Sequence, residues 1–270
     1  MSSHQATGRL TVPELQRMKV EGRKIAVLTA YDATFARLLD QAGMDIVLVG
    51  DSLGMVVQGH GTTLPVSVDH MTYHSRCVSH ASERALIVAD LPFMSYPTPE
   101  RAADNGARLI QEGGAQMVKL EGGQTRLNVV RFLVEQDIPV CGHLGLQPQS
   151  IHKLGRYSVQ CRDAASAESL MNNALALQDA GISLLVLECV PSDLARAVSE
   201  RLEVPVIGIG AGPHCDGQVL VLHDMLGLHP GRPPRFVKNF LEGSSGIAEA
   251  VERYIAAVRA GQFPGPEHGY

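Results

Sequence analysis

The sequence is poor in the features that mark nucleic-acid-binding and membrane proteins. Its 270 residues contain no tryptophan and only 4% are aromatic, which leaves few rings on which bases could stack. The formal net charge is −5, and Lys and Arg are scattered rather than gathered into a basic patch. No apolar run approaches the roughly 20 residues of a membrane span. We therefore expect neither nucleic acid nor a membrane as a partner.

The sequence also lacks signs of export. The segment Met1–Leu10 is polar and holds no apolar stretch of signal-peptide length. The five cysteines are odd in number, widely spaced and form no C-x-x-C pair. Free thiols in a reducing compartment fit this pattern, so we expect a cytoplasmic protein.

No Pro/Ser-rich linker or charge run divides the chain. With 45% hydrophobic residues, it can bury one large α/β core. We predict a single domain over residues 1–270, with flexible ends near 1–10 and 261–270.

Strand-like and helix-like segments alternate along nearly the whole chain. Strands are predicted, the last one less clearly, at 25–30, 46–50, 86–90, 117–121, 140–144, 184–188, 206–210 and 219–222. Helices are predicted at 32–42, 68–82, 100–112, 125–136, 164–180, 192–201 and 246–259. Such alternation indicates parallel strands, and eight of them favour a closed (β/α)₈ TIM barrel over an open sheet. The weak point is the segment 211–218, which is too short for a crossover helix.

One further helix is predicted ahead of the first strand. Thr11 and Glu14 form a capping-box pattern, and Pro13 stands near the first helical position. The helix should run to about Val20. We expect it to close the bottom of the barrel.

Four apolar strand candidates end on an acid: Asp51, Asp90, Glu121 and Glu188. A carboxylate at the end of a buried strand is costly unless it is paired, hydrogen-bonded or bound to a metal. Because residues i and i+2 of a strand share a face, Lys119 lies on the same face as Glu121. The active site of such a barrel lies at the C-terminal mouth, so six side chains should converge there: Asp51, Asp90, Lys119, Glu121, His143 and Glu188.

Asp51, Asp90 and Glu121 form an all-oxygen set, which suits Mg²⁺ better than Zn²⁺. Such an ion could be chelated by a 2-oxo acid and could stabilise the enolate formed when a proton leaves the adjacent carbon. The alternative is that these acids form salt bridges with Lys119 or with arginines at the barrel mouth.

The other polar residues of the mouth allow more than one role. Lys119 could stabilise substrate charge or form an imine, and neighbouring carboxylates favour the first role because they keep it protonated. Glu188 is the candidate general base, with an outer metal ligand as the alternative. His143 could bind substrate, act as the base or fill the core.

Three other patterns carry weaker signals. His70 and His74 have metal-ligand spacing, but Met71 stands where H-E-x-x-H needs its Glu, so a packing role is favoured. The glycines of 208–212 resemble a phosphate cradle without the full G-x-G-x-x-G pattern, and close packing explains them better. The segment Gly54–Thr63 is either a mobile flap or an ordinary long loop.

Six ordered motifs resemble the ketopantoate hydroxymethyltransferase (3-methyl-2-oxobutanoate hydroxymethyltransferase) family. They are Tyr31–Phe35, Val49–Gly54, Ala89–Phe93, Val118–Gly122, Gly142–Pro148 and Leu187–Pro191. The similarity extends from about Thr11 to Gly243, nearly the whole chain. The resemblance implies a (β/α)₈ enzyme of pantothenate biosynthesis, which supplies the coenzyme A precursor. It also implies one Mg²⁺ per subunit and a homo-oligomer, commonly a decamer.

The resemblance implies the reaction and a role for each matching residue. A hydroxymethyl group passes from 5,10-methylenetetrahydrofolate to 3-methyl-2-oxobutanoate, giving 2-dehydropantoate and tetrahydrofolate. The implied metal ligands are Asp51, Asp90 and Glu121. The implied substrate-binding residues are Asp51, Ser52, Asp90, Lys119 and His143, and Glu188 is the implied catalytic base.

Two other functions remain open from the sequence. A metal-dependent lyase or mutase of the phosphoenolpyruvate/pyruvate barrel class would use the same metal and oxo-acid site. It should also carry a nucleophilic Cys or a phosphonate-binding set, and neither is evident in the sequence. A non-catalytic metabolite-binding barrel should have lost one of the four acids, and all four are present.

Overall fold

The computed structural model describes residues 8–229 and 231–270. Eight parallel strands, each paired with its neighbour in the chain, form a barrel that closes where β8 pairs with β1. They are β1 (Ile25–Thr29), β2 (Ile46–Val49), β3 (Leu86–Asp90), β4 (Met117–Glu121), β5 (Val140–Gly145), β6 (Leu184–Glu188), β7 (Val206–Ile209) and β8 (Gly217–Leu220). The predicted (β/α)₈ barrel is confirmed.

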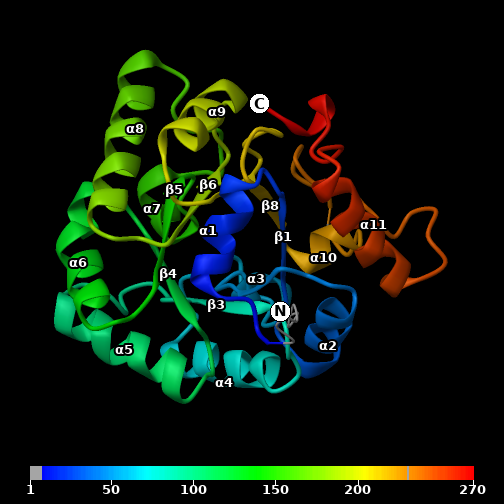
Figure 1. Ribbon diagram of the computed structural model, residues 1–270, viewed down its shortest axis with the longest axis horizontal. Coiled ribbons are helices and arrows are strands. Elements are labelled where there is room, and N and C mark those ends of the chain that lie inside the picture. Colours follow the sequence, from blue (N-terminus) through cyan, green and yellow to red (C-terminus); the bar gives the residue numbers. More distant parts are fainter. Residues whose placement is uncertain (1–7, 230) are drawn as a thin grey trace, which may run out of the picture.

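Seven long helices surround the strands in Figure 1: α2 (Ala33–Gln41), α4 (Val68–Ser79), α5 (Pro99–Gln111), α6 (Leu127–Glu135), α8 (Ala164–Asp179), α9 (Ser192–Arg201) and α11 (Ile247–Arg259). Short helices follow three strands: α3 (Leu53–Val56), α7 (Ile151–Leu154) and α10 (Leu222–Met225). Three 3₁₀ turns complete the elements: η1 (Gln124–Arg126), η2 (Pro148–Ser150) and η3 (Pro266–His268). Within the described ranges, none of these helices is long and apolar enough to cross a membrane.

Polar side chains cap the start of four of the long helices, α2, α4, α5 and α8. Asp32 accepts the N–H groups of Thr34 and Phe35 at the start of α2, and Asp163 accepts the N–H of Ser166 at the start of α8. These contacts satisfy backbone donors that a helix leaves free at its N-terminus. Each helix then packs an apolar stripe against the strands, and this packing fixes the helix next to the barrel.

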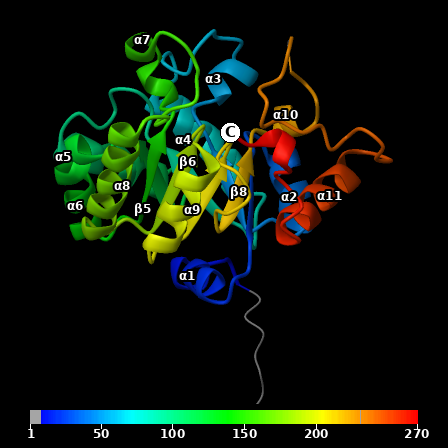
Figure 2. The same ribbon diagram turned by 90° about the horizontal axis from the view of Figure 1, so that it is seen from above.

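Helix α1 (Val12–Val20) closes the end of the barrel where the strands begin. Leu15 and Met18 of this helix are buried against the core. Lys19 Nζ lies 2.7 Å from Asp216 Oδ2, directly before β8, and also donates to the carbonyl of Ser199. Figure 2 shows α1 at the end of the barrel opposite α3 and α7, as the sequence predicted.

The eighth strand begins two residues earlier than predicted, at Gly217 rather than 219. A Cβ on Gly217 would collide with the carbonyl oxygen of Ile25, so close strand pairing requires glycine here. Glycine is a poor strand former, which hid the start of the strand. Residues 210–216 join β7 to β8 directly, and α10 and α11 follow the last strand instead.

The two ends that we predicted to be flexible differ in how much the structure describes. Residues 1–7 lie outside the described residues, whereas Leu10 donates its N–H to the carbonyl of Arg84 at 2.7 Å. At the other end Phe263 is buried, and Tyr270 accepts the N–H of Ser192 at 2.9 Å. The flexibility of these ends stays a prediction.

Candidate active site

A cavity of about 780 Å³ lies at the C-terminal mouth of the barrel. The structure brings all seven residues singled out from the sequence to its wall: Asp51, Ser52, Asp90, Lys119, Glu121, His143 and Glu188. Asp90, Lys119, Glu121, His143 and Glu188 lie on strands β3 to β6, and parallel pairing holds those strands side by side. Asp51 and Ser52 lie in the turn after β2. This is the position expected for an active site in this fold.

Strand register pairs Asp90 with Lys119. These residues are directly opposite each other on β3 and β4, and Lys119 Nζ lies 2.9 Å from Asp90 Oδ1. The second carboxylate oxygen of Asp90 accepts the backbone N–H of Asp51 at 3.0 Å. Asp90 therefore links the turn after β2 to the cation on β4.

The mouth holds more carboxylates than its one ammonium can neutralise. Burial disfavours the charged form of Lys119, but the charges of Asp90, Asp51 and Glu121 outweigh burial and raise its pKa above the usual value. Burial, and next the charge of Asp90, raises the pKa of Asp51 to about 7. Burial, and next the charge of Asp51, raises the pKa of Glu121 well above its usual value. Lys119 is thus held protonated, and added positive charge would stabilise the acids.

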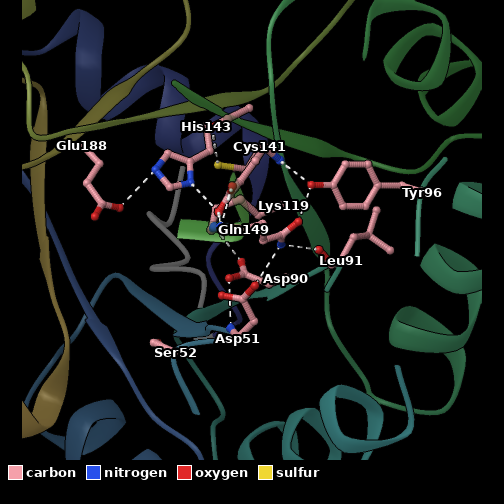
Figure 3. A network of polar contacts seen from close by, with 12 residues as sticks. Asp51, Ser52, Asp90, Leu91, Tyr96, Lys119, Cys141, His143, Gln149 and Glu188 are labelled. Atoms are coloured by element: carbon pink, nitrogen blue, oxygen red, sulfur yellow. Dashed lines mark hydrogen bonds and ion pairs between the residues drawn. The ribbon is translucent and has the colours of Figure 1, made fainter. Parts of the chain in front are cut away.

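His143 lies between two of the acids. Its Nε2 is 3.2 Å from Glu188 Oε2, and its Nδ1 is 3.8 Å from Glu121 Oε1 (Figure 3). Burial, and next the charge of Lys119, lowers the pKa of His143, although Glu188 acts in the opposite direction. The imidazole is therefore neutral near pH 7. It lies beside the carboxylate of Glu188, which also borders the cavity.

Sequence analysis missed Gln149, which contacts two of the predicted metal ligands. Its side-chain Nε2 donates to Asp51 Oδ2 at 2.8 Å, and its backbone N–H donates to Glu121 Oε2 at 3.1 Å. Gln149 comes directly after the motif Gly142–Pro148, and this position was the one available signal. Gln149 lies in the short turn η2, outside the regular strands and helices, so no hydrophobic periodicity in the sequence points to it.

The structure does not present a preformed metal cluster. In residues 8–229 and 231–270, no three His, Cys, Asp or Glu side chains are grouped closely enough to hold an ion as they stand. Donors from Gln149 contact Asp51 and Glu121 instead, and Lys119 pairs with Asp90. The roles of Asp51, Asp90 and Glu121 as ligands therefore stay predictions.

The outer part of the cavity is mostly apolar and was also missed. It is lined by Met55, Tyr157, Leu228, Phe236 and Tyr270, which come from segments distant in the sequence. Ser52, nearer the carboxylates, is held by a 2.8 Å hydrogen bond between its Oγ and the Tyr31 hydroxyl. The cavity thus has a charged floor and an apolar entrance.

The weaker sequence signals have structural explanations. His70 Nδ1 accepts the N–H of Ser67 at the start of α4, and His74 Nδ1 lies 2.7 Å from the carbonyl oxygen of Tyr31. His70 therefore caps the helix at its exposed surface and His74 contacts the backbone next to β1, which agrees with a helix-surface or packing role for the pair. A Cβ at Gly208 would lie 2.9 Å from Cys215 Sγ, so close packing also explains that glycine.

The cysteines do not supply a nucleophile. All five are free thiols, and Cys189 borders the cavity next to Glu188. Burial, and next the charge of Glu188, raises the pKa of the Cys189 thiol. Burial raises the pKa of Cys141 to about 12. Raised pKa values keep these two thiols protonated, and protonated thiols are poor nucleophiles.

Comparison with known proteins decides the family. Residues 9–266 match the family model for ketopantoate hydroxymethyltransferase. The chain belongs to this family. The 3-methyl-2-oxobutanoate hydroxymethyltransferase of Methylococcus capsulatus is 59% identical over 264 residues, which cover 98% of each chain. The resemblance stated from six motifs is thereby confirmed over nearly the full length.

Solved structures resemble this member of the family in fold alone. Phosphonopyruvate hydrolase in complex with oxalate and Mg²⁺ aligns with a TM-score of 0.63 at 12% identity, covering 81% of this chain and 83% of that one. A 2,3-dimethylmalate lyase of the PEP mutase/isocitrate lyase superfamily aligns with a TM-score of 0.59 at 17% identity, covering 81% and 80%. These proteins share the barrel fold. At such low sequence identity, their activities are not assigned to this chain.

Proposed function

We propose that this chain transfers a hydroxymethyl group from 5,10-methylenetetrahydrofolate to 3-methyl-2-oxobutanoate, giving 2-dehydropantoate and tetrahydrofolate in pantothenate biosynthesis. Family membership over residues 9–266 supports the reaction. The observation that carries the chemistry is a single cavity in which three carboxylates and one ammonium face Glu188.

The carboxylates fit a bound Mg²⁺. Asp51, Asp90 and Glu121 offer oxygen atoms alone, and burial, followed by the neighbouring carboxylates, raises the pKa values of Asp51 and Glu121. These three residues are the proposed ligands. When bound, the ion supplies a Lewis acid that draws electron density from the keto group of the oxo acid.

Lys119 stabilises negative charge on the substrate. Its ammonium lies in the cavity floor, 2.9 Å from Asp90, and is buried away from water. A fixed cation in a dry site stabilises an oxyanion more strongly than one in water does. Because its pKa is raised, Lys119 is a poor nucleophile, and an electrostatic role replaces the imine alternative.

Glu188 removes the proton from C3 of the oxo acid. It has a partly exposed side chain at the cavity wall, with His143 behind it. The neutral imidazole orients the carboxylate and leaves its basic oxygen toward the cavity. C3 then forms a C–C bond to the methylene carbon, and both C–N bonds of the methylene bridge break. Water supplies the hydroxyl oxygen and leaves its protons on the two nitrogens of tetrahydrofolate, and Glu188 returns the C3 proton to the new hydroxyl group. Asp51, Ser52, Asp90, Lys119 and His143 are the proposed substrate contacts.

The size of the cavity supports a second, larger substrate. A volume of about 780 Å³ lies in the range of sites that hold drug-sized ligands and exceeds the need of a five-carbon acid. The apolar entrance formed by Tyr157, Phe236 and Tyr270 suits a flat heteroaromatic ring. We assign this outer part to the folate co-substrate.

Proton exchange tests the proposal without the folate. We expect the C3 proton of 3-methyl-2-oxobutanoate to exchange with deuterated solvent when protein and Mg²⁺ are present, and to exchange far more slowly after chelation. Adding 5,10-methylenetetrahydrofolate should convert the acid to 2-dehydropantoate, measured by NMR. Protein that neither exchanges the proton nor forms the product would contradict the proposed function.

Two properties implied by the family resemblance stay proposals. We expect a homo-oligomer, with a decamer as the specific form, which sedimentation velocity would test. We also expect a cytoplasmic enzyme, which fractionation of the source cells would test.

A further inference from the structure

Gln149 lies at the centre of a hydrogen-bond network that joins the carboxylates of the mouth (Figure 3). Its Nε2 donates to Asp51 Oδ2 at 2.8 Å and to the carbonyl of Leu91 at 3.0 Å. Its Oε1 accepts from the Tyr96 hydroxyl at 2.5 Å. Its backbone N–H donates to Glu121 at 3.1 Å. Buried Gln149 thus forms hydrogen bonds through both ends of its side-chain amide and through its backbone N–H.

These partners fix the orientation of the Gln149 amide. Both neighbours of Nε2, Asp51 Oδ2 and Leu91 O, are acceptors, and the neighbour of Oε1 is a hydroxyl that donates. Turning the amide over would place its oxygen against two other oxygens and leave them without donors. Buried acceptors that lose their donors are costly, so this orientation is strongly preferred.

Gln149 stands where the site has no cation. Lys119 pairs with Asp90, whereas neither Asp51 nor Glu121 has a Lys or Arg nitrogen within 4.0 Å in the described part of the chain. Gln149 gives each of these two acids one neutral N–H donor. Gln149 lines an adjoining cavity of about 340 Å³, and Glu121 lines both this cavity and the main one.

Tyr96 supports Gln149 from the side of the adjoining cavity. Its hydroxyl accepts the N–H of Glu121 at 3.3 Å and donates to Gln149. The Arg126 guanidinium lies 5.2 Å from the centre of its ring and holds the ring in place. Tyr96 has no contact with Asp51 among those recorded for the described residues, so its influence on that acid passes through Gln149.

We propose that Gln149 is a positioning residue, which restricts the carboxylates of Asp51 and Glu121 relative to each other and so strengthens the binding of a divalent cation by these acids. Tyr96 acts on Asp51 through Gln149. The inference rests on the proposed function, because it concerns the same metal-binding acids. Residues that orient metal ligands contribute about 10–100-fold to metal affinity or activity.

Calorimetric titration of Mg²⁺ into metal-free, full-length protein tests this role. Gln149→Ala should weaken Mg²⁺ binding about 10–100-fold, the range found for residues that orient metal ligands. Gln147→Ala is the matched control, because Gln147 lies on the same loop and lines the adjoining cavity without joining the network. This control should bind Mg²⁺ with wild-type affinity.

The double variant separates positioning from a general effect on folding. Tyr96→Phe keeps the ring and its contact with Arg126, and should weaken Mg²⁺ binding in the wild-type background. It should weaken binding less in the Gln149→Ala background than in the wild-type background, because its route to Asp51 is already lost and only its contact with the Glu121 backbone remains. Fully additive losses would overturn the proposal.

The titration also separates this inference from the proposed function. Wild-type affinity in Gln149→Ala, with binding lost in Asp51→Ala, would overturn the role of Gln149 and leave the metal site standing. A wild-type protein that bound no Mg²⁺ would overturn both. A lower melting temperature of Gln149→Ala with unchanged Mg²⁺ affinity would likewise make the residue structural only and overturn its positioning role.

Discussion

The two ends of the barrel each hold a Lys–Asp ion pair, and the surroundings of the two pairs differ. At the bottom, Lys19 and Asp216 lie 2.7 Å apart, Lys19 also donates to Ser199, and Asp216 also accepts the N–H of Val206. At the mouth, the Lys119–Asp90 pair has Asp51 and Glu121 beside it, and neither of these acids has a Lys or Arg nitrogen within 4.0 Å among the residues that the structure describes.

An ion pair alone therefore does not mark a functional site. The bottom pair is balanced in charge and uses its remaining polar atoms for backbone contacts, which ties α1 and β8 together. The mouth holds uncompensated carboxylates whose pKa values are raised, a feature that is costly to folding and typical of active sites. Substitutions at the bottom should therefore change stability alone, whereas substitutions at the mouth should also change catalysis or metal binding.

The largest effect should come from Glu188→Gln. This variant keeps the size of the side chain but lacks the basic oxygen, and losing a general base typically costs about 10²–10⁴-fold in rate. Turnover and deuterium exchange at C3 should both fall by this amount, while Mg²⁺ affinity is retained. Exchange at the wild-type rate, measured by NMR, would move the base to His143.

Lys119→Ala should be the most destabilising change at the mouth. Removing one member of a buried ion pair costs about 3–5 kcal/mol, because the remaining charge has no partner. The free energy of unfolding in urea should fall by this amount without metal and recover partly with Mg²⁺. If the variant lost the same free energy of unfolding with and without Mg²⁺, the ion would not neutralise the carboxylate that Lys119 leaves unpaired.

Lys19→Ala should have a smaller effect and only on stability. The pair is partly buried and hydrogen-bonded, so we expect a loss of about 1–3 kcal/mol in unfolding free energy. Turnover per folded molecule should be unchanged, because the bottom lies at the far end of the barrel. Reduced turnover in fully folded variant would break the proposed separation of the two ends.

Asp51→Asn should act in the opposite direction and give a gain in the stability of the metal-free protein. The native pKa of Asp51, about 7, exceeds the unfolded value near 3.9, so the native state binds more protons between these values. Stability of the metal-free protein should therefore fall as pH rises from about 4 to 7. The variant should flatten this fall and melt at a higher temperature than the metal-free wild-type protein at pH 8. Unaltered pH dependence would contradict the repulsion among the acids.

Much of this architecture could be predicted because buried strands and their terminal acids repeat in the sequence. The charged residues of the mouth, such as Asp90 and Glu121, stand at strand ends, where the fold dictates their direction. Gln149 and Tyr96 lie on loops, and only the folded chain brings them to the acids. Tyr270 reaches the cavity from the end of the chain, a placement that no local pattern encodes.

Thermal unfolding with increasing Mg²⁺ is the sharpest test of whether the carboxylates of the mouth bind one divalent cation. A ligand that binds only the native state adds about 2.7 kcal/mol at 100 times its dissociation constant. The account predicts a saturable rise in melting temperature for wild-type protein and for Lys19→Ala, and no rise for Asp51→Asn. A rise that persisted in Asp51→Asn, or none in wild-type protein, would contradict it.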